Sequence, residues 1–297
     1  MDGAMTIFDI LAWAGDILKA ADVTRSVKQN PRLDAQVLLS YVLNVNSAYL
    51  FTHGDEAVKS DAAETFQRLV ARRARHEPVA YLTQTKAFFG RDFFVNQHVL
   101  IPRPDTEVLV EAALAVIDSR STIVDIGTGS GAIAISLELE THRPTFAIEI
   151  DRDTKSVAEH NARNLGSNTV FIEGSLFEPF AALEPIADHL VITANLPYLT
   201  PWQWNDLDAD VKDYEPRLAL VGGADGLALY DELCNQIRTY LHETSRKGKR
   251  INVDLFIEID PSQRQTAPSL LTTHFPKARI ELIKDMRSRE RVVHALI

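Results

Sequence analysis

Apolar residues recur at the spacing of α-helices through the N-terminal part of the chain, from about residue 5 to residue 77. Two stripes carry this pattern: Ile7, Ile10, Leu11, Ala14 and Leu18, then Leu33, Val37, Leu38, Tyr41 and Val42. Pro31 and Pro78 interrupt the pattern, and no alternating apolar and polar stretch precedes residue 86. We therefore predict a small helical domain over residues 1–84.

The pattern changes to an aromatic and β-branched one between residues 86 and 101, around Gly90 and the pair Asn96-Gln97. It predicts a β-hairpin that links two domains, with residues 85–104 as the linker. Pro102 and Pro104 then stiffen the chain, and Asp105 or Thr106 can begin the next helix.

Strand and helix patterns alternate after that helix. Seven strands are expected near residues 123–126, 146–150, 169–172, 190–194, 253–259, 279–284 and 291–296, with helices at 132–140, 154–164, 226–243 and 261–273. Such alternation is typical of an α/β fold with a mostly parallel, Rossmann-like sheet covered on both faces. The turn at residues 285–289 joins the last two strands as a hairpin, so one strand should be antiparallel. The second domain would then span residues 85–297.

Charge and composition restrict the partners. The formal net charge is −10, which disfavours duplex nucleic acid because such binding depends on clustered Lys and Arg. The arginines at 68, 72, 73 and 75 are expected to form one solvated helix face. No run of about 18 apolar residues and no export signal is evident, so we expect a cytoplasmic protein without a membrane partner. The single cysteine, Cys234, is expected to be a buried apolar residue.

A glycine-rich turn follows the first strand of the second domain, with Gly127, Gly129 and Gly131 preceded by Asp125. Ligands of open α/β sheets bind at such turns. The G-x-G-x-G spacing differs from the dinucleotide pattern and favours S-adenosylmethionine, whose ribose an acidic residue after the next strand would bind. Glu149 holds that position, and Asp151 is a second candidate. A purely structural turn and a nicotinamide cofactor are the alternatives.

Asn195, Leu196, Pro197 and Tyr198 follow the fourth strand and are the candidate catalytic residues. An amide nitrogen is a poor nucleophile, so a methyltransferase must position it. The side-chain oxygen of Asn195 and the carbonyl of Leu196 can accept hydrogen bonds from a target NH₂ group. Pro197 restricts the loop, and Tyr198 can lie against a flat amide or base. An ordinary strand exit is the alternative.

The sequence resembles the release-factor glutamine methyltransferases of the HemK/PrmC type over nearly the whole chain. The resemblance rests on Phe93-Phe94-Val95, Val99-Leu100-Ile101-Pro102-Arg103-Pro104-Asp105-Thr106-Glu107, Asp125-Ile126-Gly127-Thr128-Gly129-Ser130-Gly131, Glu215-Pro216-Arg217-Leu218-Ala219-Leu220, Gly222-Gly223 with Asp225-Gly226-Leu227, and Lys284-Asp285 before Arg291-Val292-Val293.

The resemblance implies transfer of a methyl group from S-adenosylmethionine to a glutamine side-chain amide of a peptide chain release factor, leaving S-adenosylhomocysteine. It implies that Asp125, Gly127, Thr128, Gly129, Ser130, Gly131, Glu149, Leu176 and Asn195 contact the cofactor, with Leu176 at the adenine. Residues 195–198 would receive the glutamine, and the helical domain would help dock the release factor. Arg103 and Glu107 either act beside the substrate or pair with each other to brace the linker.

Five positions depart from the family pattern. The family typically has Pro where Leu196 stands, Glu at Asp105, Asp at Glu149 and an acidic residue at Ser175, and it tends to place a glycine after the glutamate that corresponds to Glu258. Two other functions stay open: methylation of an adenine amine in RNA or DNA, and a cofactor-binding protein without activity. The histidines show no metal-ligand spacing, so no metal is expected, and we expect a monomer.

Overall fold

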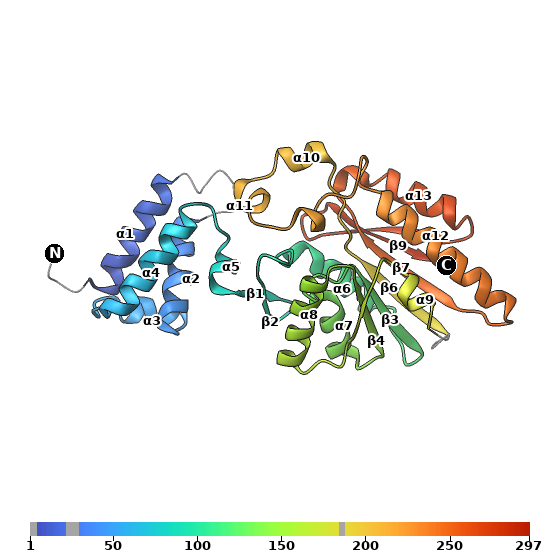
Figure 1. The fold of residues 1–297 in the computed structure, drawn as a ribbon, viewed down its shortest axis with the longest axis horizontal. Coiled ribbons are helices and arrows are strands. Elements are labelled where there is room, and N and C mark those ends of the chain that lie inside the picture. The colour runs from blue at the N-terminus through green and yellow to red at the C-terminus, as the bar shows by residue number, and fades with distance from the viewer. Residues whose placement is uncertain (1–4, 22–29, 184–187) are drawn as a thin grey trace. The chain divides into compact units, whose positions relative to one another are not determined.

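The computed structural model describes residues 5–21, 30–183 and 188–297. The chain forms two compact units (Figure 1). The first comprises Met1–Thr85 and Leu207–Tyr214, and the second comprises Lys86–Asp206 and Glu215–Ile297. The sequence pattern places a boundary between residues 84 and 85, but it gives no sign that residues 207–214 return to the first unit.

The first unit is helical. Its helices are α1 (Ile7–Ala20), α2 (Pro31–Leu43), α3 (Ser47–Thr52), α4 (Ser60–Arg73), α5 (Val79–Thr83) and α11 (Ala209–Lys212). Thr6 and Asp9 form a capping box at the start of α1, and the Asn30 side chain caps α2 ahead of Pro31. Ile10, Leu38 and Phe66 are fully buried in its core.

Two details of this unit differ from what the sequence pattern alone indicates. Leu33, Val37 and Tyr41 are exposed, because the buried face of α2 is formed by Ala35, Leu38 and Leu39. The four arginines do not share one solvated face, because Arg73 is only 3% exposed and its Nε atom donates to Asp34 at 2.8 Å. Arg72 pairs with Glu77 on the surface. A helical period alone does not say which of two neighbouring stripes faces the core.

The hairpin at the start of the second unit consists of β1 (Thr85–Phe88) and β2 (Arg91–Phe94). Phe89 and Gly90 form its turn with φ angles of 47° and 74°, which suit the twist of a two-residue hairpin. Residues 99–101 are not a strand, although their side chains at 99 and 101 are buried. A short 3₁₀ helix, η1 (Pro104–Thr106), precedes α6 (Glu107–Leu114), and no side chain caps α6.

Seven strands form the main sheet in the order β5-β4-β3-β6-β7-β9-β8. They are β3 (Ser121–Ile126), β4 (Thr145–Glu149), β5 (Val170–Glu173), β6 (His189–Ala194), β7 (Asn252–Glu258), β8 (Arg279–Lys284) and β9 (Glu290–Leu296). Of the seven strands, β9 alone runs opposite to the others, as the predicted closing hairpin requires. The predicted fold class is therefore confirmed.

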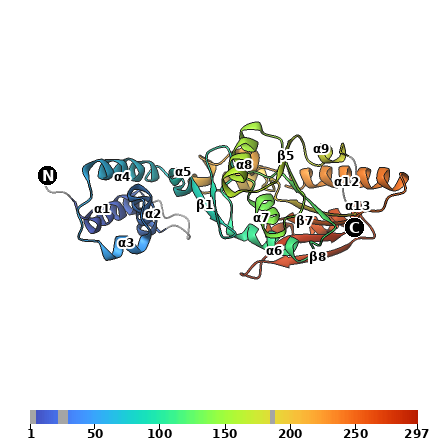
Figure 2. The same cartoon turned by 90° about the horizontal axis from the view of Figure 1, so that it is seen from below.

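Helices cover both faces of this sheet (Figures 1 and 2). α6, α7 (Ala132–Thr141) and α8 (Arg152–Leu165) pack on one face, which includes Ile123 and Val191. α9 (Glu178–Ala181), α12 (Ala228–Arg246) and α13 (Thr266–His274) contribute to the core on the other face, with Val124 and Ile192. The predicted helix 261–273 is instead a 3₁₀ turn, η3 (Pro261–Gln263), followed by α13. The remaining segments are α10 (Pro201–Asn205) and η2 (Arg217–Ala219). No helix of the described part of the chain is long and apolar enough to cross a membrane.

The order of the strands places a binding crevice at β3 and β6. The chain winds outward from β3 through β4 to β5, and then returns to place β6 on the other side of β3. Ile126 and Ala194, the last residues of these two parallel strands, are direct neighbours in register. The loops that follow them therefore begin side by side at the carboxyl edge of the sheet, where ligands of open α/β sheets bind.

Asp254 of β7 joins three strands through two side-chain hydrogen bonds. Its carboxylate contacts Nε2 of His189 on β6 at 2.7 Å and Nε2 of His294 on β9 at 2.5 Å. Burial alone would raise the pKa of Asp254, but the hydrogen bonds from the two histidines outweigh it and hold the pKa at about 2, below the usual 3.8. The stabilisation is therefore present above pH 3.8 and is lost as the pH falls through about 2.

We expect Asp254→Asn to lower the free energy of unfolding by about 2 kcal/mol at neutral pH. Urea denaturation measures this loss, and Asp188→Asn, an exposed residue at the same edge of the sheet, is the matched control. The loss should shrink as the pH approaches 2, because the wild-type carboxylate then becomes protonated. Equal stability of D254N and wild type at pH 7 would contradict this role.

Candidate active site

The loop between β3 and α7 has an unusual backbone. Gly127, Gly129 and Gly131 have φ angles of 66°, 59° and 82°, a region that favours glycine. A Cβ atom on Gly127 would lie 2.8 Å from Cδ2 of Leu196, so a side chain at 127 would push against the loop that follows β6. A Cβ atom on Gly129 would meet nothing within 4 Å, which leaves that backbone open to a ligand.

Asp125 anchors this loop through a side-chain hydrogen bond. Its buried carboxylate accepts hydrogen bonds from the hydroxyls of Thr128 and Thr193, both at 2.7 Å. Burial raises the pKa of Asp125 to about 6, and the two hydroxyls act in the opposite direction. The sequence predicts that Asp125 faces the cofactor, whereas the structure places it under the glycine loop and outside the lining of the cavity described below.

Glu149 ends β4 and reaches across to the same loop. Its Oε2 atom accepts from the backbone N–H of Gly129 at 3.0 Å, and its Oε1 atom accepts from those of Ile150 and Asp151 at 2.9 and 3.1 Å. Burial raises the pKa of Glu149, and these N–H groups oppose the rise. Asp151, the second candidate, instead caps α8 through the N–H of Thr154 at 2.8 Å.

A cavity of about 330 Å³ opens beside these residues at the carboxyl edge of the sheet. Of the residues predicted from the sequence, it is lined by Gly127, Gly129, Glu149, Asp151, Leu176, Asn195, Leu196 and Pro197. The glycine loop and the loop after β6 therefore face one cavity, as the predicted chemistry requires. Its volume is in the range of small-molecule sites.

Several lining residues were not predicted from the sequence. They are Gln97, His98, Leu100, Ile148, Ile150, Thr154, Gly174, Ser175, Pro216, Leu218, Ala219 and Leu229. The stretch from Glu215 to Leu220 is one of the segments that carry the family resemblance, and that resemblance is the sequence signal for its importance. Its residue pattern does not predict that it lines this cavity. Among these lining residues, Leu100, Ile148 and Ile150 add apolar walls, and Leu218 is exposed at the surface.

The loop after β6 is held by its backbone. The N–H of Leu196 donates to the Tyr230 hydroxyl at 3.1 Å, and that hydroxyl donates to the carbonyl of Glu258 at 2.6 Å. A proline at 196 has no N–H and cannot form the first bond. Leu196 thus replaces one source of rigidity, a proline ring, with another, a buried hydrogen bond to α12.

Two glycines fit closely against the same loop. A Cβ atom on Gly222 would lie 1.8 Å from the carbonyl oxygen of Pro197, and one on Gly226 would lie 1.9 Å from that of Tyr198. Any side chain at these positions would displace the loop. The Gly222-Gly223 and Asp225-Gly226-Leu227 segments therefore support the loop rather than the ligand.

A second, smaller hollow of about 50 Å³ adjoins the cavity, because Gly127, Gly129 and Asn195 line both. Thr128, Ser130 and Arg103 also line it. Gly131 lines neither space and instead caps α7.

Arg103 and Glu107 bind other partners rather than each other, so the pairing given above as one of two alternatives is wrong. Arg103 forms an ion pair with Glu215, and the Glu107 carboxylate accepts from the N–H of Phe89 at 3.0 Å. Each residue braces a different segment: Arg103 holds the stretch that begins at Glu215, and Glu107 holds the hairpin turn.

Tyr198 turns away from the cavity. Its hydroxyl donates to Oε1 of Glu258 at 3.4 Å, and its ring packs against the core beneath the sheet edge. It does not line either of the two spaces at the glycine loop.

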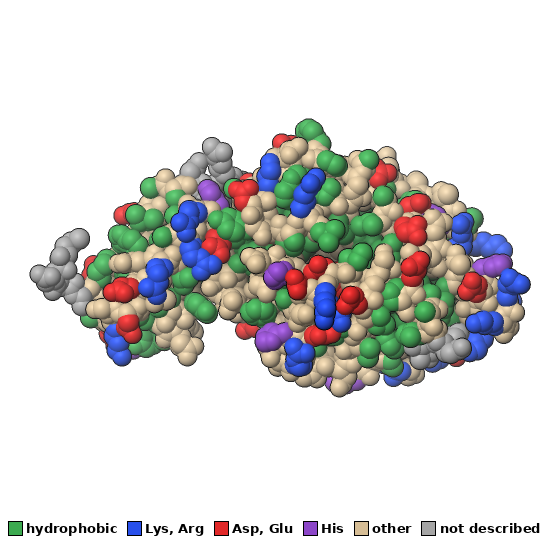
Figure 3. Space-filling view, in the orientation of Figure 1, with side chains coloured by type: hydrophobic (Ala, Val, Ile, Leu, Met, Phe, Trp, Pro, Cys, Tyr) green, Lys and Arg blue, Asp and Glu red, His purple; other side chains and the backbone are tan. Residues whose placement is uncertain are grey.

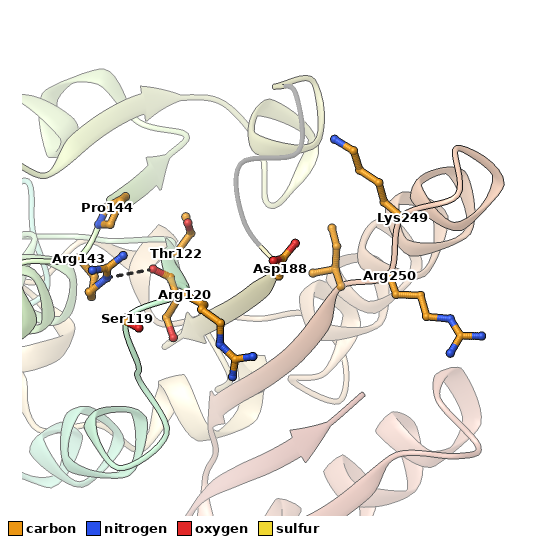
Figure 4. Close-up of a pocket in the computed structure, with 10 residues that line it drawn as sticks. Ser119, Arg120, Thr122, Arg143, Pro144, Asp188, Lys249 and Arg250 are labelled. Carbon is orange, nitrogen blue, oxygen red and sulfur yellow. Dashed lines mark hydrogen bonds between the residues drawn. The ribbon is translucent and has the colours of Figure 1, made fainter.

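A larger hollow of about 460 Å³ lies at the opposite edge of the sheet (Figure 4). Its basic side chains are largely engaged or turned away. Arg120 pairs with Asp118 at 2.7 Å, Arg143 donates to the carbonyl of Ser121 at 3.4 Å, and Arg250 points away from the other labelled residues. It contains none of the predicted site residues. Within the described ranges, no group of three or more His, Cys, Asp or Glu side chains could hold a metal ion.

Comparison with known proteins gives matches that together cover nearly the whole chain. Residues 9–83 match the family model of the PrmC N-terminal domain. The release factor glutamine methyltransferase of Bacillus cereus is 32% identical over 299 residues, covering 98% of this chain and 99% of that protein. The enzyme of the same name from Bacillus subtilis is 33% identical over 299 residues, covering 98% of each. Among solved structures, a methyltransferase from Pyrococcus furiosus aligns with 17% identity and a TM-score of 0.49, covering 76% of this chain and 97% of that chain.

Proposed function

The chain belongs to the release factor glutamine methyltransferase family, and from that premise we propose that it transfers a methyl group from S-adenosylmethionine to the side-chain amide nitrogen of a glutamine in a peptide chain release factor. One observation carries the proposal: Gly127, Gly129 and Glu149 line the same cavity as Asn195 and Leu196. A cofactor bound by the first group would face a substrate bound by the second.

The residues of the cavity suit this cofactor. The open space beside Gly129 can admit the methionine part of S-adenosylmethionine. Glu149 is positioned to accept hydrogen bonds from the ribose hydroxyls of the cofactor. Leu176, Ile148 and Ile150 provide apolar walls for the adenine ring. When bound, S-adenosylmethionine supplies a methyl group activated by a sulfonium, so the protein needs no nucleophile of its own.

The chain's own contribution is to orient the glutamine amide. The oxygen of the Asn195 side chain and the carbonyl of Leu196 accept the two hydrogens of the target NH₂ group. This holds the nitrogen toward the methyl donor and favours the pyramidal geometry that frees its lone pair. The proton then leaves to water. Burial of Leu196 and its bond to Tyr230 fix the position of the carbonyl.

We further propose that the helical first unit docks the release factor, and that the protein works in the cytoplasm, where that substrate acts. On the face visible in Figure 3, basic and acidic side chains are interspersed rather than gathered in a basic band. Together with the net charge of −10, this favours a protein substrate over RNA or DNA.

Mass spectrometry of a release factor incubated with this protein and S-adenosylmethionine tests the proposal. We expect a gain of one CH₂ unit, located on a glutamine by fragmentation, and no gain when that glutamine is replaced by glutamate. RNA and DNA incubated in parallel should gain no labelled methyl group. A protein that binds the cofactor but leaves the release factor unmodified would overturn the proposal, and labelled nucleic acid would favour adenine as the substrate.

A further inference from the structure

Asn161 is a polar residue on the buried face of α8, where an amphipathic helix usually places an apolar side chain. Its neighbours on that face include Val157, Ala158 and Ala162, and Asn161 itself is only 1% exposed. Asparagine is also a poor residue for the interior of a helix, because its side chain competes for backbone hydrogen bonds. Burying an amide is costly unless its polar atoms are bonded, so this position calls for a physical reason.

The Asn161 side chain makes three hydrogen bonds to the backbone of two other segments. Its Oδ1 atom accepts from the N–H of Phe94 at 2.7 Å, and its Nδ2 atom donates to the carbonyl of Phe94 at 3.0 Å. Nδ2 also donates to the carbonyl of Ser130 at 2.9 Å. These partners fix the orientation of the amide, because only its oxygen can accept from an N–H group and only its NH₂ end can donate to a carbonyl.

The two segments that Asn161 joins both belong to the candidate active site. Phe94 is the last residue of β2, and residues 95–101, which follow it, form part of the wall of the cavity of about 330 Å³. We call these residues the wall segment. Ser130 lies in the glycine loop and lines the smaller hollow beside that cavity. Asn161 lines neither space, so it can act on a ligand only through these two segments.

The wall segment depends on side chains to hold its backbone, because it belongs to no helix or strand. Besides Asn161 at its start, the hydroxyl of Thr154 on α8 donates to the carbonyl of His98 at 2.7 Å. The N–H of Ile101, at its end, donates to the buried carboxylate of Glu215 at 3.0 Å. α8 therefore supplies two of these three attachments, and Asn161 is the one that also reaches the glycine loop.

The glycine loop itself packs closely against α8. A Cβ atom added to Gly131 would lie 3.3 Å from the Cβ atom of Ala158, which precedes Asn161 on the same face of the helix. Packing against a small side chain is not directional, whereas the hydrogen bond to the Ser130 carbonyl sets the orientation of that peptide group. The bond from Asn161 therefore defines how the loop is seated on the helix.

We propose that Asn161 is a positioning residue for cofactor binding, which holds the glycine loop and the wall segment in one arrangement before S-adenosylmethionine binds. This inference rests on the proposed function, because it takes its ligand to be the cofactor named there. Preorganisation lowers the cost of binding, and its loss leaves a population of molecules in which the site is not formed. Asn161 does not reach the cavity, so its effect should appear in cofactor affinity rather than in the rate of methyl transfer.

Calorimetric titration with S-adenosylmethionine measures this effect. Asn161→Leu keeps the approximate volume of the side chain and removes all three hydrogen bonds. Asn161→Asp has nearly the wild-type shape and keeps the acceptor for the Phe94 N–H, but it cannot donate to two carbonyls. Each variant should raise the dissociation constant by about tenfold or more, because buried carbonyls lose their donor and the competent arrangement is less populated. For release factor, kcat at saturating cofactor should stay within about threefold of the wild-type value.

Two control variants separate this effect from a general loss of stability. Asn164→Leu makes the same change at an exposed side chain of α8 and should leave the dissociation constant unchanged. Asp254→Asn should destabilise the fold at a residue that does not line the cavity, and its affinity should also match that of the wild type while the protein is folded. Wild-type affinity in folded N161L and N161D would contradict the inference, and so would an equal loss of affinity in D254N. A wild type that does not bind S-adenosylmethionine would instead contradict the proposed function, so the two failures are distinguishable.

Hydrogen exchange of the cofactor-free protein, followed by mass spectrometry of peptic fragments, tests the arrangement itself. In N161D, the backbone amides of the wall segment and of the glycine loop, residues 127–131, should both exchange faster than in the wild type. In D254N, these two regions should keep their wild-type rates. Saturating S-adenosylmethionine should slow exchange in both regions of the wild-type protein, a comparison that needs no variant. Faster exchange in only one of the two regions of N161D, or protection of only one by the cofactor, would contradict the inference, because the two segments would then not be held as one unit.

Discussion

Replacing Asn195 with alanine should lower kcat for methylation of a release factor by about 100- to 1000-fold, which is the usual loss when a preorganised hydrogen-bonding group at a reacting centre is removed. The side-chain oxygen of Asn195 is the acceptor that orients the glutamine amide, and water cannot hold that amide in the same direction. The dissociation constant for S-adenosylmethionine should change by less than about threefold, since the cofactor has other partners along the cavity.

Single-turnover kinetics and calorimetry separate these two effects. Asn164→Ala removes the same side chain from an exposed site near the end of α8 and is the matched control. Equal losses of kcat and cofactor affinity in N195A would mean that Asn195 serves mainly to bind the cofactor. Such a result would leave the Leu196 carbonyl as the remaining candidate for orienting the amide.

The fold was predictable because its periodic patterns are strong and local. The end of β3, Ile123–Ile126, is mostly apolar and leads directly into the glycine turn, and the alternation of strands and helices that follows leaves few possible topologies. The closing hairpin around residues 285–289 predicts the one antiparallel strand in the same way. Patterns of this kind also locate the two loops of the site, because both follow buried strands.

The supporting contacts were not predictable, because they join residues far apart in sequence. Arg103 meets Glu215 at a separation of 112 residues, rather than the nearby Glu107. Leu196 meets Tyr230, whose hydroxyl gives no signal within a helical pattern. Tyr198 faces Glu258 because of how β6 and β7 align, which the sequence does not reveal.

Buried and exposed apolar residues are also hard to tell apart from sequence when apolar residues cover more than one face of a helix. In α2 the apolar positions extend over more than one face, and packing against α1 and α4 buries Leu38 and Leu39 instead of Val37 and Tyr41. The sequence likewise predicts Arg73 to be a solvated surface residue. In the structure it is buried, and its ion pair with Asp34 offsets the cost of burying its charge. Tertiary contacts, rather than local pattern, decide these cases.

Glu149→Ala should raise the dissociation constant for S-adenosylmethionine by about 100-fold, with kcat at saturating cofactor changed by only a few-fold. Charge-assisted hydrogen bonds from two ribose hydroxyls would be lost, which is the main expected effect. In addition, the N–H groups of Gly129, Ile150 and Asp151 would lose their common acceptor, and the glycine loop would lose its link to β4.

Calorimetry on a matched pair of variants decides between the two acidic candidates. Asp151→Ala removes a carboxylate that caps α8 and should lower stability modestly, by about 1 kcal/mol, with little effect on cofactor affinity. Glu149→Gln keeps the shape of the side chain but carries no charge, and its affinity should fall between wild type and E149A. If D151A weakened binding more than E149A did, Asp151 would be the ribose ligand and Glu149 only a brace for the glycine loop. The opposite order, together with a normal kcat in E149A and a normal cofactor affinity in N195A, would establish that the cavity has two separable halves, one for the methyl donor and one for the amide.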